Sequence, residues 1–229
     1  MTPRRGVCSP LTDGAVIQQP SMARAARWLA PSLWAGGRSL LPLMVRVVYA
    51  NLEDKSMVVE IDSQKLTVES RWPLAPGEEP SGMAIDREHR RLFSGCHNKM
   101  MVVMDADSGK VVATPPIGEG VDANAFDPGT GFAFSSNGDG TLTVVHQDSP
   151  DKYTVVDNVQ TQRGARTMAL DPKTHNVYLV TAEFGPPPGP TADQPRPRPS
   201  IVPGSFTVLV VGDKQDPSVS RLKLRAESA

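Results

Sequence analysis

The hydrophobic positions between Ser81 and Gly118 recur in short runs separated by polar residues. The runs that read as strands are Met83–Ile85, Arg91–Ser94, Met101–Met104 and Val111–Thr114. The residues between them are turn formers, as in the Asp-Ala-Asp-Ser-Gly segment over 105–109. Strands of about five residues, spaced about ten residues apart and bounded by Gly, Asp and Asn, are typical of an antiparallel four-stranded unit.

The rest of the chain repeats this unit. From Val45 onward, the segments VRVVYAN, SMVVEID and LTVESRW match its second, third and fourth strands, without a counterpart of the first. Next come ANAFD, GFAFSSN, TLTVVHQD and YTVVDNV, and then MALD, NVYLVTA and SFTVLVVGD, where the outermost strand is missing. We therefore expect fourteen strands, with the first unit lacking its innermost strand and the last its outermost.

The spacing of the units identifies the fold class. Asp86 and Asp127 lie 41 residues apart, and Asp127 and Asp171 lie 44 residues apart. A repeat of about 40 to 45 residues that carries four strands is the signature of a propeller blade. The sequence predicts an all-β protein, a β-propeller of about four four-stranded antiparallel blades in an incomplete or open ring. The blades span residues 45–74 (partial), 81–118, 122–159 and 166–213.

The remaining segments do not follow the repeat. Residues 1–44 are basic without clean alternation, and we expect an irregular extension, poorly ordered or with a short helix over Met22–Trp34. A signal peptide and a mis-assigned start fused to a truncated domain are the alternatives. Residues 185–204 are rich in proline and predict a loop that leaves the sheet, or a docking loop for an aromatic-lined groove. Residues 214–229 read as a polar tail in which Val219–Leu224 could add a weak edge strand.

The amino-acid composition excludes only a few classes of binding partner. The chain has 24 basic and 25 acidic side chains, a balance that does not indicate nucleic acid as a partner. No run of about 18 apolar residues occurs, so no membrane span is expected. Two cysteines do not make a disulfide framework, and the compartment stays open.

Candidate catalytic and metal motifs are better explained as turns. Cys96-His97 lacks the first cysteine of a haem-attachment motif, because Phe93 stands in its place. The four histidines show no metal-ligand spacing, and neither the 105–109 segment nor Asn137–Gly140 has the full calcium-loop pattern. Asp86, Asp127 and Asp171 recur with the repeat, which favours capping of their own turns. The sequence therefore predicts no catalytic residue, no metal and no cofactor.

Several segments resemble the YVTN/YncE-type β-propeller repeat family. They are Val48-Tyr49-Ala50-Asn51, Val102-Val103-Met104-Asp105, Ser108–Gly118, Asp127-Pro128-Gly129, Asp171-Pro172 and Val177-Tyr178-Leu179-Val180. The resemblance implies a bacterial-type, extracytoplasmic (periplasmic or secreted) repeat protein that serves as a scaffold. Such propellers usually carry about seven blades, so the chain resembles the C-terminal part of one. An open arc would expose its end blades, and self-association through these flanks is expected.

A ligand site is predicted where the first strands of the blades begin. In a propeller these strands line the axis, and their entry residues face one mouth of the channel. In register, these residues are Ser81 and Gly82, Asp122 and Asn124, and Arg166 and Thr167. The alternative is that they are solvated loop ends on an incomplete ring.

The function predicted from these features is a non-catalytic binding scaffold for a protein or a small ligand. The resemblance leaves two alternatives open. One is a propeller enzyme, either a lactonase-like hydrolase or a relative of the quinone- or haem-dependent oxidoreductases. The other is a truncated fragment without independent function.

Overall fold

The structure is a computed structural model that describes residues 46–186, 188, 189, 197, 199–213 and 222–228. The chain divides into two units between Met44 and Val45. The predictions of a helix over Met22–Trp34 and of a signal peptide fall outside the described residues. The description below concerns the second unit.

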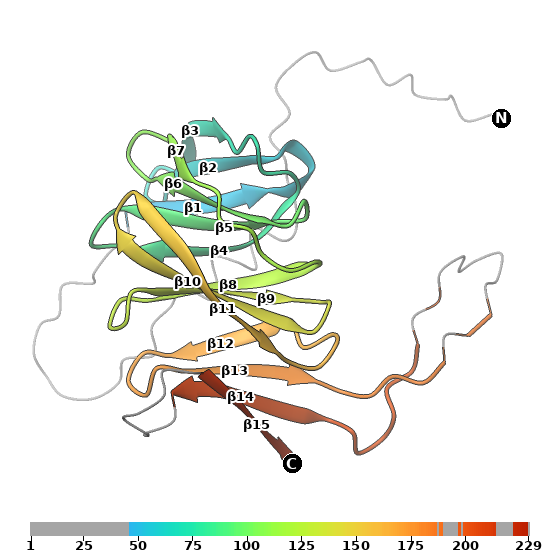
Figure 1. The fold of residues 1–229 in the computed structure, drawn as a ribbon. Helices are drawn as coiled ribbons and strands as arrows, with labels where there is room; N and C mark the ends of the chain where they lie inside the picture. The colour runs from blue at the N-terminus through green and yellow to red at the C-terminus, as the bar shows by residue number, and fades with distance from the viewer. Residues whose placement is uncertain (1–45, 187, 190–196, 198, 214–221, 229) are drawn as a thin grey trace, which may run out of the picture. The chain divides into compact units, whose positions relative to one another are not determined.

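This unit consists of four antiparallel sheets (Figure 1). Sheet 1 contains β1 (Val47–Leu52), β2 (Met57–Asp62) and β3 (Thr67–Pro73). Sheet 2 contains β4 (Pro80–Asp86), β5 (Arg91–Cys96), β6 (Met100–Asp105) and β7 (Val111–Ala113). Sheet 3 contains β8 (Val121–Asp127), β9 (Phe132–Asn137), β10 (Thr141–Ser149) and β11 (Lys152–Gln160). Sheet 4 contains β12 (Thr167–Asp171), β13 (Asn176–Thr181), β14 (Thr207–Asp213) and β15 (Leu222–Ser228). The described residues hold a single short 3-10 helix, η2 (Glu53–Lys55), and no helix among them is long and apolar enough to cross a bilayer.

The strand predictions are confirmed in the first three sheets and corrected in the fourth. The four strands expected within Ser81–Gly118 are β4 to β7, and sheet 1 has three strands as expected. The expectation that the last unit lacks its outermost strand is wrong. Strand β15 pairs with β14 from Ser228 opposite Thr207 to Leu222 opposite Asp213. The segment predicted as a polar tail therefore completes sheet 4.

The sheets follow one another in sequence order, with their first strands side by side. Strand β4 packs against β8, and β8 packs against β12. In sheet 1, β1 lies beside β4. No principal strand contact among the described residues joins sheet 1 to sheet 4. The contacts thus place the four sheets in succession, and they show no closed ring among the described residues.

Apolar side chains fill the three seams between consecutive sheets. The seam of sheets 1 and 2 contains Val58, Leu74, Leu92, Cys96, Val102, Met104 and Ala106. The seam of sheets 2 and 3 contains Phe93, Met101, Val103, Ile117, Val121, Ala133 and Val145, and that of sheets 3 and 4 contains Phe134, Leu142, Val144, Val159, Ala165, Val177, Leu179, Leu209 and Val211. Successive residues of a strand point to opposite faces, so Leu92 enters one seam and Phe93 the next. Sheets 2 and 3 are covered on both faces, which explains their nearly continuous apolar strands.

The recurring aspartates Asp86, Asp127 and Asp171 cap their own turns, as predicted, and Asp62 and Asp105 at the ends of third strands do the same. In each turn, Oδ1 accepts the backbone N–H of the residue two positions later. The distances are 2.9 Å at Asp62, 3.0 Å at Asp86, 3.2 Å at Asp105, 3.0 Å at Asp127 and 3.0 Å at Asp171. These turns connect the strands locally, and they leave Oδ2 of each carboxylate available for other contacts.

The proline-rich segment leaves sheet 4 between β13 and β14. Its two ends still pair with each other, because Phe184 and Ile201 form an isolated antiparallel bridge. Gly185 N donates to Ser200 O at 2.8 Å, and Val202 N donates to Glu183 O at 2.9 Å. Most of the segment between these ends lies outside the described residues.

Candidate functional site

Four of the predicted site residues lie together at the start of the first strands. Ser81 is in β4, Asp122 in β8 and Thr167 in β12, and Arg166 directly precedes β12. The Ser81 hydroxyl donates to the backbone oxygen of Asp122 at 3.4 Å. Thr167 Oγ1 donates to Asp122 Oδ2 at 3.4 Å, and Arg166 Nε lies 4.0 Å from Asp122 Oδ1. We call these four residues the Asp122 cluster.

The Asp122 cluster is accessible, and its ion pair is loose. The side chains of Arg166 and Asp122 are 56% and 36% exposed. An ion pair with this exposure is worth about 0 to 1 kcal/mol, so a ligand can replace it at little cost. The backbone beneath is better fixed, because the Ser136 hydroxyl of sheet 3 donates to the backbone oxygens of both Arg166 and Ala123.

The other two predicted residues, Gly82 and Asn124, serve the contact between sheets 2 and 3. A Cβ atom on Gly82 would lie 2.6 Å from the backbone nitrogen of Asn124, so glycine permits this close approach. In the amide orientation that satisfies its neighbours, Asn124 accepts the N–H of Gly95 at 3.0 Å and donates to Ala123 O at 3.0 Å. The amide of Asn124 is therefore used within the seam of sheets 2 and 3.

The Asp122 cluster offers both charged and neutral hydrogen-bonding groups. Its hydroxyls donate to oxygens of Asp122. Arg166 keeps guanidinium donors free for an anionic or carbonyl group, while Asp122 offers a carboxylate to a donor. The cluster can thus hold a small polar group between opposite charges.

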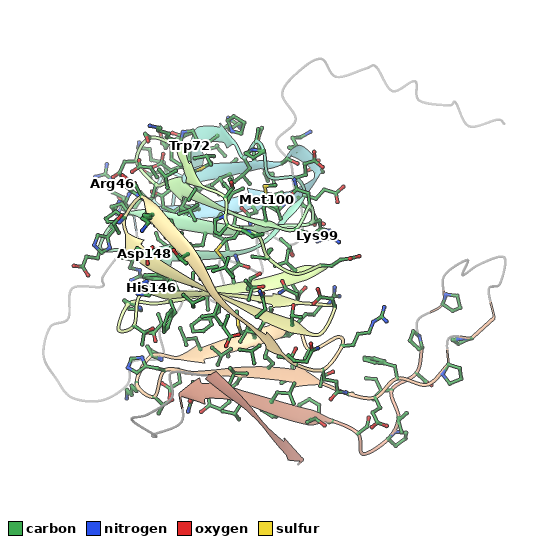
Figure 2. All side chains as sticks on the ribbon, in the orientation of Figure 1. Arg46, Trp72, Lys99, Met100, His146 and Asp148 are labelled. Carbon is green, nitrogen blue, oxygen red and sulfur yellow. The ribbon has the colours of Figure 1, made fainter. Side chains whose placement is uncertain are left out.

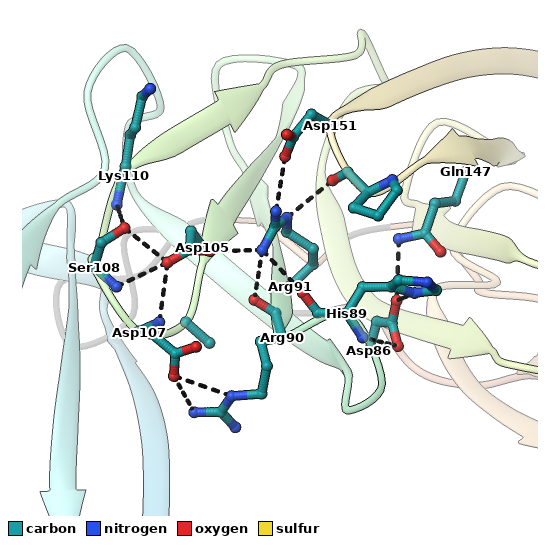
Figure 3. A network of polar contacts seen from close by, with 12 residues as sticks. Asp86, His89, Arg90, Arg91, Asp105, Asp107, Ser108, Lys110, Gln147 and Asp151 are labelled. Carbon is teal, nitrogen blue, oxygen red and sulfur yellow. Dashed lines mark hydrogen bonds and ion pairs between the residues drawn. The ribbon is translucent and has the colours of Figure 1, made fainter.

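A second polar network, which sequence reasoning missed, links sheets 2 and 3 (Figure 3). Arg91 Nη1 donates to Asp105 Oδ2 at 2.6 Å within sheet 2. Its Nη2 donates to Asp151 Oδ1 at 2.8 Å and its Nε to Pro150 O at 2.9 Å, both in the β10–β11 hairpin of sheet 3. The side chain of Arg91 is only 12% exposed. All three nitrogens of its guanidinium are engaged, so Arg91 is a brace between sheets rather than an anion site.

Asp86 belongs to the same network. Its side chain is 2% exposed, and Oδ2 accepts from Gln147 Nε2 of sheet 3 at 3.0 Å and lies 2.7 Å from His89 Nδ1. Burial would raise the pKa of Asp86, but the hydrogen bonds from Gln147, His89 and the turn backbone outweigh burial and lower it. The only sequence signal of this network was the pair Arg90-Arg91 placed soon after Asp86.

The histidines pair with carboxylates. Each Nδ1 faces an Asp or Glu oxygen: His89 with Asp86 at 2.7 Å, His175 with Asp127 at 2.7 Å, His146 with Asp148 at 2.8 Å and His97 with Glu79 at 3.7 Å. Figure 2 labels His146 and Asp148. The His175 contact crosses the seam of sheets 3 and 4, where Asp127 is buried. In the described part of the chain, no group of three or more His, Cys, Asp and Glu side chains is placed to hold a metal ion.

Cys96 is a buried thiol in the seam of sheets 1 and 2. It has no exposed surface, and burial raises its pKa to about 11. The thiol therefore stays protonated near neutral pH, and a nucleophilic role does not fit it.

The fold defines the class of this protein: an all-β protein of successive antiparallel sheets. No family model matches the chain, and no curated protein matches it. Among solved structures, the chain is similar to hydrazine synthase of Kuenenia stuttgartiensis, with a TM-score of 0.55 and 11% identity. The match covers 72% of this chain and 52% of that one, so this chain spans about half the length of the structure it matches. At this identity the likeness concerns the fold alone, and membership of the YVTN/YncE-type family stays a prediction.

Proposed function

We propose that the four sheets form an arc of β-propeller blades that acts as a non-catalytic binding scaffold, with the Asp122 cluster as its ligand-contacting site. The observation that carries this proposal is the convergence of Ser81, Asp122, Arg166 and Thr167 from three different sheets. A small number of polar groups that converge on one point can fix the orientation of a ligand on a rigid scaffold. The all-β fold with side-by-side first strands supports the propeller interpretation.

The expected ligand is a small polar molecule, or a peptide group, that bears a carboxylate or a carbonyl. Such a group can take the free donors of Arg166 and the hydroxyl of Thr167. The Asp122 carboxylate would select a ligand that also carries an amine or hydroxyl donor. This expectation follows from the opposite charges of the cluster.

The test is a ligand screen by heteronuclear NMR on the full chain, using amino acids, dicarboxylates and short peptides. We expect shifts of the Arg166 and Thr167 amides for the ligands that bind, and loss of these shifts in Arg166→Ala. Arg163→Ala is the matched control, because Arg163 is exposed, lies three residues away and is outside the cluster. Equal binding by both variants would refute the site. Turnover of ester or lactone substrates that Arg166→Ala abolishes would refute the non-catalytic assignment.

A further inference from the structure

Sheet 1 has three strands where the other sheets have four, and the position of its gap can be identified. Tyr49 of β1 packs into the seam with sheet 2, as Phe93 of β5 packs into the seam with sheet 3. Phe134 of β9 does the same toward sheet 4. In addition, β1 lies beside β4 as β5 lies beside β8. By its contacts, β1 is therefore the second strand of its sheet, and the first strand is the one that is missing.

The exposure of β1 agrees with this assignment. In β5 and β9, which have a first strand beside them, the last five of six residues are buried. In β1 all six residues are only half-buried. No described strand pairs with β1 on the side away from β2.

The open edge of β1 carries unpaired backbone groups. Ser63 N donates to Arg46 O at 2.9 Å, which sets the hydrogen-bond pattern between β1 and β2. Because bonded residues alternate in an antiparallel pair, Val48 and Ala50 direct their backbone groups toward β2. Val47, Tyr49 and Asn51 direct theirs toward the open edge, where no described residue accepts or donates. Such an edge is a template for an added strand.

The three first strands that are present show what the added strand should contain. In each, an alanine lies opposite the aromatic residue of the second strand: Ala84 opposite Phe93, Ala125 opposite Phe134 and Ala169 opposite Tyr178. A large apolar residue follows (Ile85, Phe126 or Leu170), and an aspartate comes next (Asp86, Asp127 or Asp171). An alanine opposite the aromatic residue leaves room for the aromatic ring. In β1, the residue equivalent to this aromatic residue is Tyr49.

We propose that the open edge of β1 binds an extended segment of a partner polypeptide with the pattern Ala, large apolar residue, Asp. The segment adds antiparallel to β1, with its alanine opposite Tyr49, its apolar residue opposite Val48 and its aspartate opposite Val47. Asn51 marks the far end of this edge, where its amide donates to Ser81 O at 3.1 Å and Gly82 O at 3.2 Å and ties β1 to β4. This inference rests on the proposed scaffold function. It specifies the sequence pattern of a polypeptide partner that binds at a second site, away from the Asp122 cluster.

The test uses a synthetic peptide with the sequence Ser-Gly-Met-Ala-Ile-Asp, which is that of residues 81–86. Titrated as a fluorescent probe against the full chain, it should show saturable anisotropy, and a scrambled peptide should not. Two N-methylated peptides form a matched pair. Methylation at the alanine removes an N–H that faces β1 and should weaken binding by at least about tenfold, whereas methylation at the isoleucine, whose N–H faces away, should leave binding nearly unchanged.

Amide exchange locates the bound peptide. The amides of Val47 and Tyr49 should gain protection with peptide, while Val48 and Ala50, already bonded to β2, should not change. No binding, equal binding of the scrambled peptide, or equal binding of the two methylated peptides would overturn the proposal. In Arg166→Ala the peptide should still protect the amides of Val47 and Tyr49, whatever happens to shifts at the Thr167 amide, so failure at this edge and failure of the Asp122 cluster are distinguishable.

Discussion

Phe93 and Tyr178 occupy the same place in their sheets but differ in what covers them. Each lies on a second strand, opposite an alanine of the first strand. Phe93 has no exposed surface, stacks on Phe126 at a centroid distance of 5.0 Å and meets the edge of Tyr153 at 5.7 Å. Tyr178 is only half-buried, and none of the three apolar clusters of the described residues includes it. The same position in the repeat can therefore contribute different amounts to the free energy of unfolding. The contribution depends on whether a following sheet buries the side chain.

The neighbours of Tyr178 extend this contrast. Val180, Val208 and Val210 are half-buried on the same face of sheet 4. The corresponding face of sheet 2, with Met101 and Val103, is fully buried against sheet 3. Self-association through such a flank stays a prediction, whereas the difference in burial is a property of the fold.

The largest expected effect is on stability at Phe93. Phe93→Ala deletes a fully buried ring between two sheets and should lower the free energy of unfolding by about 3 to 5 kcal/mol. Tyr178→Ala, at the equivalent but open place, should cost about 1 kcal/mol or less. Urea denaturation followed by circular dichroism measures both variants. Similar costs for the two would show that sheet 4 is covered as sheet 2 is.

The next effect concerns the polar brace between sheets 2 and 3. Arg91→Ala removes the donor to Oδ2 of Asp105 and one of the two donors to the backbone oxygen of Pro150, and should cost about 2 kcal/mol. This value lies between those of buried and exposed ion pairs because Arg91 is 12% exposed, whereas Asp151 is 71% exposed.

The control for Arg91 is an exposed ion pair between the β5–β6 turn and the loop that precedes β8. Glu119 lies 2.9 Å from Lys99, but the two side chains are 69% and 59% exposed. Glu119→Gln should therefore change the free energy of unfolding by less than about 0.5 kcal/mol. If urea denaturation gave the same loss for both variants, the Arg91 network would be no more than a surface ion pair.

These contrasts also explain which features the sequence could predict. The strands and aspartate turns follow from residues within a few positions of one another, so local patterns suffice. The contact of Gln147 with Asp86 joins residues 61 positions apart, and nothing local indicates it. Asn124 was expected among the site residues because its register matches that of Ser81 and Arg166. Its use in the seam depends on Gly95 of another sheet, which sequence spacing does not reveal.

Strand β15 is a different kind of miss. Its sequence, LKLRAES, alternates apolar and polar residues in the way an edge strand does. Its polar composition favoured a tail, and a weak strand was expected only over Val219–Leu224. The alternation of apolar and polar residues predicts this strand better than the overall polarity does, because an outermost strand needs only one apolar face.

The smallest expected effect concerns Asp148, whose hydrogen bonds stay within one hairpin and do not join sheets 2 and 3. Asp148 in the β10–β11 hairpin accepts from His146 at 2.8 Å and from Thr154 at 2.7 Å. The hydrogen bond with His146, followed by that with Thr154, lowers the pKa of Asp148 to about 2. The ordinary value is about 3.9, so the ionised form is favoured in the folded state. Its contribution is complete above this ordinary value and is lost as the pH falls through about 2.

Asp148→Asn should therefore lower Tm slightly at pH 5, and the difference from the parent chain should shrink as the pH approaches 2. Asp54→Asn is the control, because Asp54 is an aspartate that is 77% exposed and lies outside this hairpin. Carboxyl NMR titration reads the same property directly at Asp148. A midpoint near the ordinary value would mean that the hairpin contacts do not hold the carboxylate. Because every partner of Asp148 lies in its own hairpin, this effect should persist in Arg91→Ala, which disturbs only the link between sheets 2 and 3.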